Sequence, residues 1–200
     1  MSFFFHRLPA KKEKFFSRWS LKLDGPIFSS PNERDGILFV ATVAGSLYAI
    51  CATSQRILWK MSTSAPIFSS PCIFEDARSN KMIAIACHDG HIKVVDFSSG
   101  RLVYEYSASP GTAVYSSPSV VQTGSSVLVS SFHTNGMFLG IQNALERDIW
   151  EVASPMPAFQ LPGPIFSSPV SVTQPNGNVG MIVGCRDNNV YCINVDYRNM

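Results

Sequence analysis

Short apolar runs separated by turn-forming residues follow one another along most of this chain. The runs are five to seven residues long and rich in Val, Ile, Phe and Tyr, which is typical of β-strands. They occur in pairs, at Ile37–Val43 with Leu47–Cys51, Met82–Cys87 with Ile92–Phe97, Val127–Phe132 with Met137–Ile141, and Met181–Cys185 with Val190–Val195. Each pair encloses a sequence that suits a tight hairpin, namely Ala44-Gly45, Asp89-Gly90, Asn135-Gly136 and Asn188-Asn189. The pattern predicts four β-hairpins and no long helix.

A seven-residue motif precedes each predicted hairpin. It reads Gly-Pro-Ile-Phe-Ser-Ser-Pro at residues 25–31 and 163–169, and close variants stand at 65–71 and 112–118. The closing prolines of the four copies lie 40, 47 and 51 residues apart. A period of this length indicates a repeat protein, and four short strands per repeat are typical of a β-propeller blade. We therefore expect an all-β propeller of four-stranded blades, located at about 26–62, 66–107, 113–153 and 164–195.

An aromatic residue follows each of the first three hairpins. Trp59, Tyr104 and Trp150 all stand 14 residues after the turn glycine of their repeat. Insertions therefore fall elsewhere in the repeat, mainly between the Ser-Ser-Pro motif and the first hairpin strand, as loop variation on a fixed scaffold does.

A further tryptophan marks the start of the repeats. Trp19 stands seven residues before Pro26, just as Trp59 stands seven before Pro66. Residues 15–21 are therefore expected to form the outer strand of a preceding or closing blade. Residues 1–14, which carry several basic side chains, are expected to be a poorly ordered arm.

The Ser-Ser-Pro part of the motif needs a structural explanation, because proline cannot donate a hydrogen bond within a sheet. The innermost strand of a blade has one free edge toward the central channel, and small serines fit where the inner strands converge. We assign the motif to this strand. The alternative, that the serines are nucleophiles, requires a base and an orienting group beside each of them, and four equivalent copies do not describe one active site.

Three segments carry a family resemblance. Ala49–Trp59 resembles the AxDxxTGKxxW docking motif of pyrroloquinoline-quinone-type β-propellers, and Val94–Tyr104 matches it better, with Asp96, Gly100 and Arg101 in register. Gly140–Trp150 keeps little beyond the tryptophan. The resemblance covers roughly residues 15–195 and implies that the aromatic residue of each repeat docks onto the neighbouring blade. The expected blade-docking residues are Trp19, Trp59, Tyr104 and Trp150.

Within that superfamily, the repeats are most similar to the C-terminal propeller of an ATP-dependent acyl-activating enzyme of the acyl-CoA synthetase family. Full-length members carry adenylation and carrier domains, whose signatures this chain lacks. The resemblance therefore implies a non-catalytic scaffold that contacts proteins or domains, with no catalytic residue and no cofactor.

Two other function classes stay open. A quinone-dependent dehydrogenase would need calcium-binding side chains at the channel mouth, and the candidates Asp89, Asn135 and Asn188 are already explained as turn residues. A lumenal or envelope scaffold built from the same repeats would need a signal peptide, and the run Phe3-Phe4-Phe5 is too short for one. We expect a cytoplasmic location.

Composition and charge limit the classes of partner and ligand that we expect for this chain. The net charge of +2 and the charged fraction of 15% favour neither nucleic acid nor an anionic membrane. The five cysteines are odd in number and fall in or beside predicted strands, which indicates buried thiols in a reducing compartment. His88 and His91 could begin a metal site, but they flank a hairpin turn without an evident third ligand, so we expect no metal.

The number of blades raises a question of closure. A ring of four blades requires a larger turn between neighbours than the seven- or eight-bladed rings that these repeats resemble. We therefore expect an open arc, a fragment of a larger ring, whose two exposed blade faces favour self-association. The long connection Ala153–Gly163 is the candidate partner-contact loop, through its apolar residues Met156, Phe159 and Leu161.

Overall fold

The computed structural model describes residues 19–123, 126–146, 149–153, 160–173 and 179–195. The described residues contain no helix, and their strands form four separate antiparallel sheets, which we call blades 1 to 4 in chain order. Blade 1 consists of β1 (Asn32–Arg34), β2 (Ile37–Ala41), β3 (Ser46–Cys51) and β4 (Ile57–Ser62). Blade 2 consists of β5 (Cys72–Glu75), β6 (Lys81–Ala86), β7 (Ile92–Asp96) and β8 (Leu102–Tyr106). Blade 3 consists of β9 (Ser119–Thr123), β10 (Ser126–Phe132), β11 (Phe138–Ala144) and β12 (Ile149–Val152), and blade 4 of β13 (Val170–Thr173), β14 (Val179–Gly184) and β15 (Val190–Val195).

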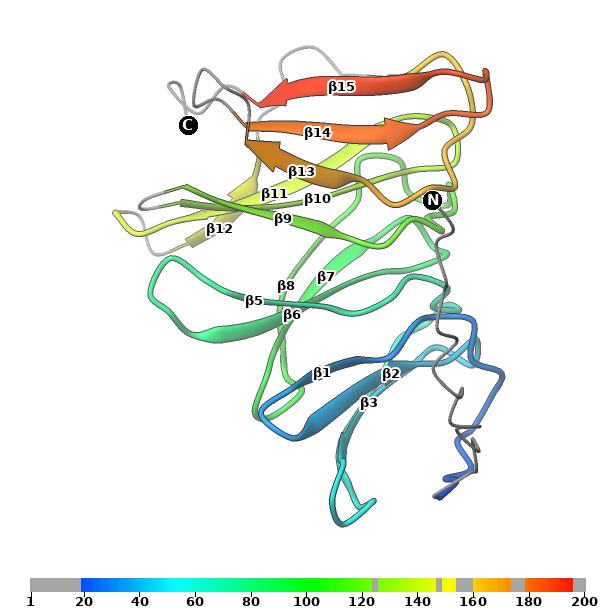
Figure 1. The fold of residues 1–200 in the computed structure, drawn as a ribbon, viewed down its shortest axis with the longest axis vertical. Coiled ribbons are helices and arrows are strands. Elements are labelled where there is room, and N and C mark those ends of the chain that lie inside the picture. The colour runs from blue at the N-terminus through cyan, green and yellow to red at the C-terminus, as the bar shows by residue number, and fades with distance from the viewer. Residues whose placement is uncertain (1–18, 124–125, 147–148, 154–159, 174–178, 196–200) are drawn as a thin grey trace, which may run out of the picture.

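The blades are stacked face to face in an open arc, with blade 1 and blade 4 at opposite ends (Figure 1). The first strands of successive blades contact one another, β1 with β5, β5 with β9 and β9 with β13, so these are the inner strands of the arc. The predicted all-β propeller fold and its open form are confirmed.

Apolar side chains fill the spaces between blades because each sheet has two faces and both must leave water. One cluster joins blade 1 to blade 2 and contains Phe39, Leu47, Ile83, Ile85 and Val95. A second joins blade 2 to blade 3 and contains Ala84, Ile92, Val94, Val129 and Leu139. Two smaller clusters join blade 3 to blade 4.

The first described residues do not form the strand that the sequence predicts. Residues 19–21, the described part of the predicted outer strand 15–21, adopt no strand, and the prediction is wrong for these three residues. Leu21 and Leu23 instead pack against Val40, Tyr48 and Ile50 and cover part of the outward face of blade 1.

Asp24 fixes this segment to blade 1. Its carboxylate accepts hydrogen bonds from the hydroxyls of Thr42 at 2.9 Å and Ser46 at 2.6 Å, and it pairs with Lys60 Nζ at 2.9 Å. Burial raises the pKa of Asp24, but the hydrogen bonds from Ser46, Lys60 and Thr42 outweigh it and hold that pKa well below its ordinary value.

The Ser-Ser-Pro motif lies just outside the innermost strand, not within it. In all four blades the first strand begins at the residue after the closing proline. The assignment of the motif to the strand itself is therefore wrong by a few residues. Because the prolines lie outside the ladder, their missing N–H groups remove no bond from it.

Candidate interaction surfaces

The first serine of each motif ties the motif to the end of the second strand. Ser69 Oγ donates to the carbonyl oxygen of Ala86 at 2.8 Å and accepts from its N–H at 2.9 Å. Ser167 makes the same pair of bonds with Gly184, at 2.8 and 3.0 Å. The equivalent hydroxyls reach the same backbone position in their blades, from Ser29 to Ala41 and from Ser116 to Phe132.

The second serine connects blade to blade. The backbone N–H of Ser30 donates to Ser70 Oγ, that of Ser70 to Ser117 Oγ, and that of Ser117 to Ser168 Oγ, each at 2.8 Å. These three bonds form a chain across the inner edge of the arc, which we call the serine ladder. The serine ladder supports the structural interpretation of the serines, because the hydroxyls of Ser70, Ser117 and Ser168 each already accept a hydrogen bond from the neighbouring blade.

The motif aromatics form a row beside the serine ladder. Ring centroids lie 5.8 Å apart between Phe28 and Phe68, 4.9 Å between Phe68 and Tyr115, and 5.4 Å between Tyr115 and Phe166. Phe28 and Phe166, at the ends of this aromatic row, are exposed to solvent. Because exposed apolar patches mark interaction sites, this row is a candidate interaction surface.

Two polar groups border the aromatic row. His88 Nε2 lies 3.0 Å from the hydroxyl oxygen of Tyr115, and its ring stands 5.6 Å from that of Phe68. The guanidinium carbon of Arg186 lies 5.3 Å from the centre of the Phe166 ring. The row therefore combines apolar faces with hydrogen-bonding groups.

His88 and His91 do not converge. His91 Nδ1 lies 3.2 Å from Asp89 Oδ1, while His88 turns to Tyr115. Within the described part of the chain, no three His, Cys, Asp or Glu side chains are grouped so as to hold a metal ion.

The calcium-ligand candidates serve their turns. Asp89 Oδ1 accepts from the N–H of His91, and Asn135 Oδ1 accepts from the N–H of Met137, both at 3.1 Å. Asn188 has a φ of 70°, which an asparagine tolerates in a tight turn.

Trp59 joins blade 1 to blade 2. Its Nε1 donates to the carbonyl oxygen of Phe97 at 3.0 Å, and its ring lies 5.8 Å from that of Phe39. The six-membered ring sits on Gly100, where a Cβ atom would come within 2.6 Å of Cε3. Gly100 has a φ of 70°, a conformation that favours glycine. The close approach of the Trp59 ring also leaves no room for a Cβ atom at this position.

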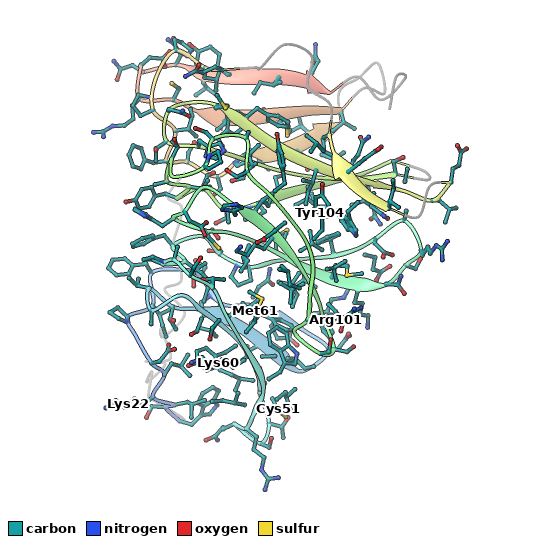
Figure 2. All side chains as sticks on the ribbon, turned by 180° about the vertical axis from the view of Figure 1, so that it is seen from behind. Lys22, Cys51, Lys60, Met61, Arg101 and Tyr104 are labelled. Atoms are coloured by element: carbon teal, nitrogen blue, oxygen red, sulfur yellow. The ribbon has the colours of Figure 1, made fainter. Side chains whose placement is uncertain are left out.

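Trp150 points in the opposite direction. Its ring lies 5.9 Å from Phe74 and 6.5 Å from Tyr104, both of which belong to blade 2. Tyr104 faces blade 3 from the other side of the same interface, as Figure 2 shows between the second and third sheets. Trp150 therefore packs backward onto blade 2, whereas Trp59 packs forward.

A register difference explains the reversal. Trp59 pairs with Ala49, four residues after its turn glycine, but Trp150 pairs with Asn143, seven residues after its own. A shift by an odd number of residues moves a side chain to the other face of a sheet. Ala153, next to Gly140, takes the forward position and packs near Met181 of blade 4.

Trp19 and the predicted partner-contact residues differ in exposure. Trp19 is exposed over 37% of its surface. Leu161 is only 4% exposed and packs with Phe132, Ile165 and Val183, so its assignment as a partner-contact residue is wrong. Met156 and Phe159 lie outside the described residues.

The cysteines are not uniformly buried. Burial raises the pKa of the Cys72 thiol to about 11 and that of Cys87 to about 12, where Asp89 adds to the effect. Cys192, in contrast, is exposed, so the prediction of buried thiols is wrong for this residue.

The two ends of the arc expose residues that are buried elsewhere. The third motif residue is 47% exposed at Ile27 and 0% exposed at Ile67, Val114 and Ile165. The second residue after the turn residue of positive φ (Gly45, Gly90 or Asn188) is 75% exposed at Val190 and 0% exposed at Leu47 and Ile92. Among the described residues, each end of the arc therefore presents a blade face without a neighbouring blade.

Known proteins share this architecture. Residues 16–195 match the family model described as outer membrane protein assembly factor BamB, a pyrroloquinoline-quinone-type repeat family. The chain belongs to this family. Within the described residues of this BamB-type chain, no helix is long and apolar enough to cross a membrane.

Two curated relatives of this BamB-type chain carry the name β-alanine-activating enzyme. The protein from Danio rerio is 27% identical over 197 residues, a match covering 84% of this chain and 15% of the relative. The protein from Drosophila melanogaster is 25% identical over 189 residues, covering 88% and 18%. The chain thus spans less than a fifth of the length of these relatives.

Solved structures show the same fold at low identity. The computationally designed Ika4 protein has a TM-score of 0.61 at 11% identity, covering 88% of this chain and 94% of its own. BamB from Moraxella catarrhalis has a TM-score of 0.60 at 14% identity, covering 88% and 63%. A quinohemoprotein alcohol dehydrogenase from Comamonas testosteroni has a TM-score of 0.53 at 12% identity, covering 80% and 29%. The resemblance to quinone-type propeller repeats is confirmed.

Proposed function

We propose that this chain is a non-catalytic propeller module that binds another protein domain through the aromatic row. The observation that carries this proposal is the contact of Phe28, Phe68, Tyr115 and Phe166 along one edge, with the terminal rings exposed. Aromatic side chains supply much of the binding energy in protein interfaces, because they bury a large area with few rotatable bonds.

The names of the relatives suggest the partner. Both are β-alanine-activating enzymes, and this chain corresponds to a small part of each. In this proposal the partner is the remainder of such an enzyme, which performs the activation, while the propeller holds or positions it in the cytoplasm.

The hydrogen bonds of the candidate polar residues favour a scaffold over an enzyme. The internal motif serines bond to backbone groups of their own or the neighbouring blade. Asp89 and Asn135 are engaged by their own turns. A quinone-dependent dehydrogenase would need such side chains to converge on a bound calcium ion.

A capture assay tests the partner. The immobilised chain is exposed to a β-alanine-activating enzyme from which the propeller segment has been removed. We expect saturable binding that the double variant Phe28→Ser/Phe166→Ser weakens at least about tenfold, since both substituted rings are exposed anchors. The control is Leu145→Ser, an apolar residue away from the row that is as exposed as Phe166. Equal binding by both variants contradicts the assignment of the surface.

A second assay tests the absence of catalysis. The chain is incubated with pyrroloquinoline quinone and Ca²⁺, and alcohol oxidation is followed with a redox dye. We expect no turnover above a heat-denatured control. Turnover that depends on both additions would assign the chain to the dehydrogenases instead.

A further inference from the structure

The serine ladder has a direction, and its two ends are complementary. Each blade donates the N–H of its second serine to the hydroxyl of the next blade. At the first blade, the hydroxyl of Ser30 has no donor among the described residues. At the fourth blade, the N–H of Ser168 has no serine acceptor among the described residues. One end thus offers an acceptor and the other a donor.

The apolar surfaces at the two ends are complementary in the same sense. Ile67, Val114 and Ile165 are each covered by the blade before them, and Ile27 lacks such a blade. Val190 occupies the position of Leu47, which in blade 1 faces the blade after it. The exposed face of blade 4 is therefore a forward face, and that of blade 1 is a backward face.

Residues 19–23 reinforce this match. Met61, from the outer strand of blade 1, packs on blade 2 against the cluster that includes Ile83 and Ile85 (Figure 2). Leu21 packs on the corresponding face of blade 1, against Val40 and Ile50. The segment thus lies where the outer strand of a preceding blade would lie, while the described residues of blade 4 form three strands, β13 to β15.

We propose that two copies of this chain join head to tail, with blade 4 of one copy against blade 1 of the other. In this joint Ser168 N–H donates to Ser30 Oγ of the second copy, and the forward face around Val190 covers Ile27. The contact repeats the geometry of the three internal joints, so one chain carries both of its halves. A heterologous contact of this kind closes a ring of two copies if the rotation allows and otherwise extends the arc.

The inference deepens the proposed scaffold function by naming a second copy as a partner. Because the joint repeats the three internal joints, it would bring Phe166 of one copy beside Phe28 of the other, so capture is also measured with Val190→Asp, which keeps both rings and lacks the forward face. The two failures are then distinguishable: a monomeric chain that still captures the enzyme domain refutes the joint alone, and a self-associating chain whose Val190→Asp variant does not capture it refutes the scaffold function alone.

Analytical ultracentrifugation of complementary variants tests the joint. The wild-type chain is expected to associate from its 22.0 kDa monomer in a concentration-dependent manner. Ile27→Asp blocks the backward face and Val190→Asp blocks the forward face, so each variant alone should be at least about tenfold weaker in association. Leu145→Asp, exposed in a turn of blade 3, is the matched control and should associate like the wild type.

Mixing the two face variants gives the sharper result. Each retains the face that the other has lost, so an equimolar mixture should form a heterodimer with a single joint. A chain that stays monomeric at all concentrations overturns the proposal. So does a mixture that fails to associate while circular dichroism shows that both variants are folded.

Disulfide trapping identifies the residues in contact. Chains carrying Ser30→Cys are mixed with chains carrying Ser168→Cys, oxidised, and digested, and the linked peptides are identified by mass spectrometry so that native cysteines do not confuse the assignment. The internal control is the double variant Ser30→Cys/Ser70→Cys, whose residues form a rung within one chain. We expect both links, and closure of the internal link without the intermolecular one contradicts the joint.

Discussion

The joint between blades 1 and 2 and the joint between blades 3 and 4 are built from equivalent repeats but differ in the side chain that closes them. The first is closed by Trp59, which both packs on Gly100 and donates to Phe97. At the second, Ala153 stands in the forward position, and the local cluster is completed by Met181. The tryptophan of the third repeat has been turned toward blade 2 by a three-residue difference in register. Equal spacing in sequence therefore does not secure equal placement, because strand register decides which face a residue occupies.

The largest expected effect comes from removing the docking tryptophan of the first joint. Trp59→Ala should lower the free energy of unfolding by about 3 kcal/mol, the lower end for a Trp→Ala change because the ring is only partly buried. Chemical denaturation followed by circular dichroism measures it. Trp19→Ala serves as the control and should cost much less, because Trp19 is exposed. An unchanged midpoint for Trp59→Ala would contradict the described joint.

The contact between Trp59 and Gly100 can be tested without substituting the tryptophan. Gly100→Ala and Gly111→Ala introduce the same methyl group at similar positive φ angles, 70° and 80°. Only at Gly100 would the new Cβ collide with Trp59, since Gly111 has nothing within 4 Å. Both substitutions should cost about 1–2 kcal/mol from backbone strain, and Gly100→Ala should cost about 1–3 kcal/mol more because the ring is displaced. In a Trp59→Ala background this difference should disappear, and its persistence would refute the contact.

A double-mutant cycle distinguishes the backward packing of Trp150 from a forward one. Trp150 and Tyr104 stack across the joint of blades 2 and 3, so their alanine substitutions should show a coupling of about 0.5–1.5 kcal/mol. Trp150 and Trp59 belong to different joints and should be additive within about 0.5 kcal/mol. Additive effects of the Trp150 and Tyr104 substitutions would contradict the backward packing of Trp150 and favour the forward packing that the spacing predicts.

The smallest effect concerns pH at the joint of blades 2 and 3. His133 is fully buried, its Nδ1 lies 3.0 Å from the carbonyl oxygen of Thr112, and burial lowers its pKa. The unfolded chain therefore binds a proton more readily than the folded chain. The free energy of unfolding should therefore have its full value above about pH 6.5 and should decrease as the pH falls below that value. Thermal unfolding between pH 7 and pH 5.5 should show a larger loss for the wild type than for His133→Gln, and equal losses would exclude His133 as the cause.

The turn residues made the fold predictable from sequence. Gly45, Gly90 and Gly136 adopt positive φ angles, as their hairpins require, and the recurrence of these turns behind a fixed motif defines the blades. The apolar runs on either side then have only one arrangement that buries both faces of each sheet, which is stacking.

The reversal of Trp150 was not predictable from the spacing alone. In the first two repeats, five residues separate the third and fourth strands, and the turn contains a positive φ, at Gln55 and Gly100. In the third repeat only four residues separate β11 from β12, and Glu146 stands where Gly100 would align. The residue type at this position carries no signal either, because the first repeat has Gln55 there and its Trp59 packs forward.

The serine ladder was missed for a different reason. Its bonds join residues 40, 47 and 51 positions apart and involve a backbone donor, which no residue pattern reveals. The available hint was that both serines are present in all four motifs, while the residues before them change to Val114 and Tyr115 in the third.

The direction of the serine ladder has a consequence for how such chains lengthen. Every rung uses one N–H and one hydroxyl from the same type of residue, so a rung does not depend on how many others exist. A repeat duplicated by recombination would bring its own donor for the unit that follows and its own acceptor for the unit that precedes it. Growth by whole units therefore creates no unmatched polar group in the interior of the array, and the number of blades is free to vary while the local chemistry stays the same.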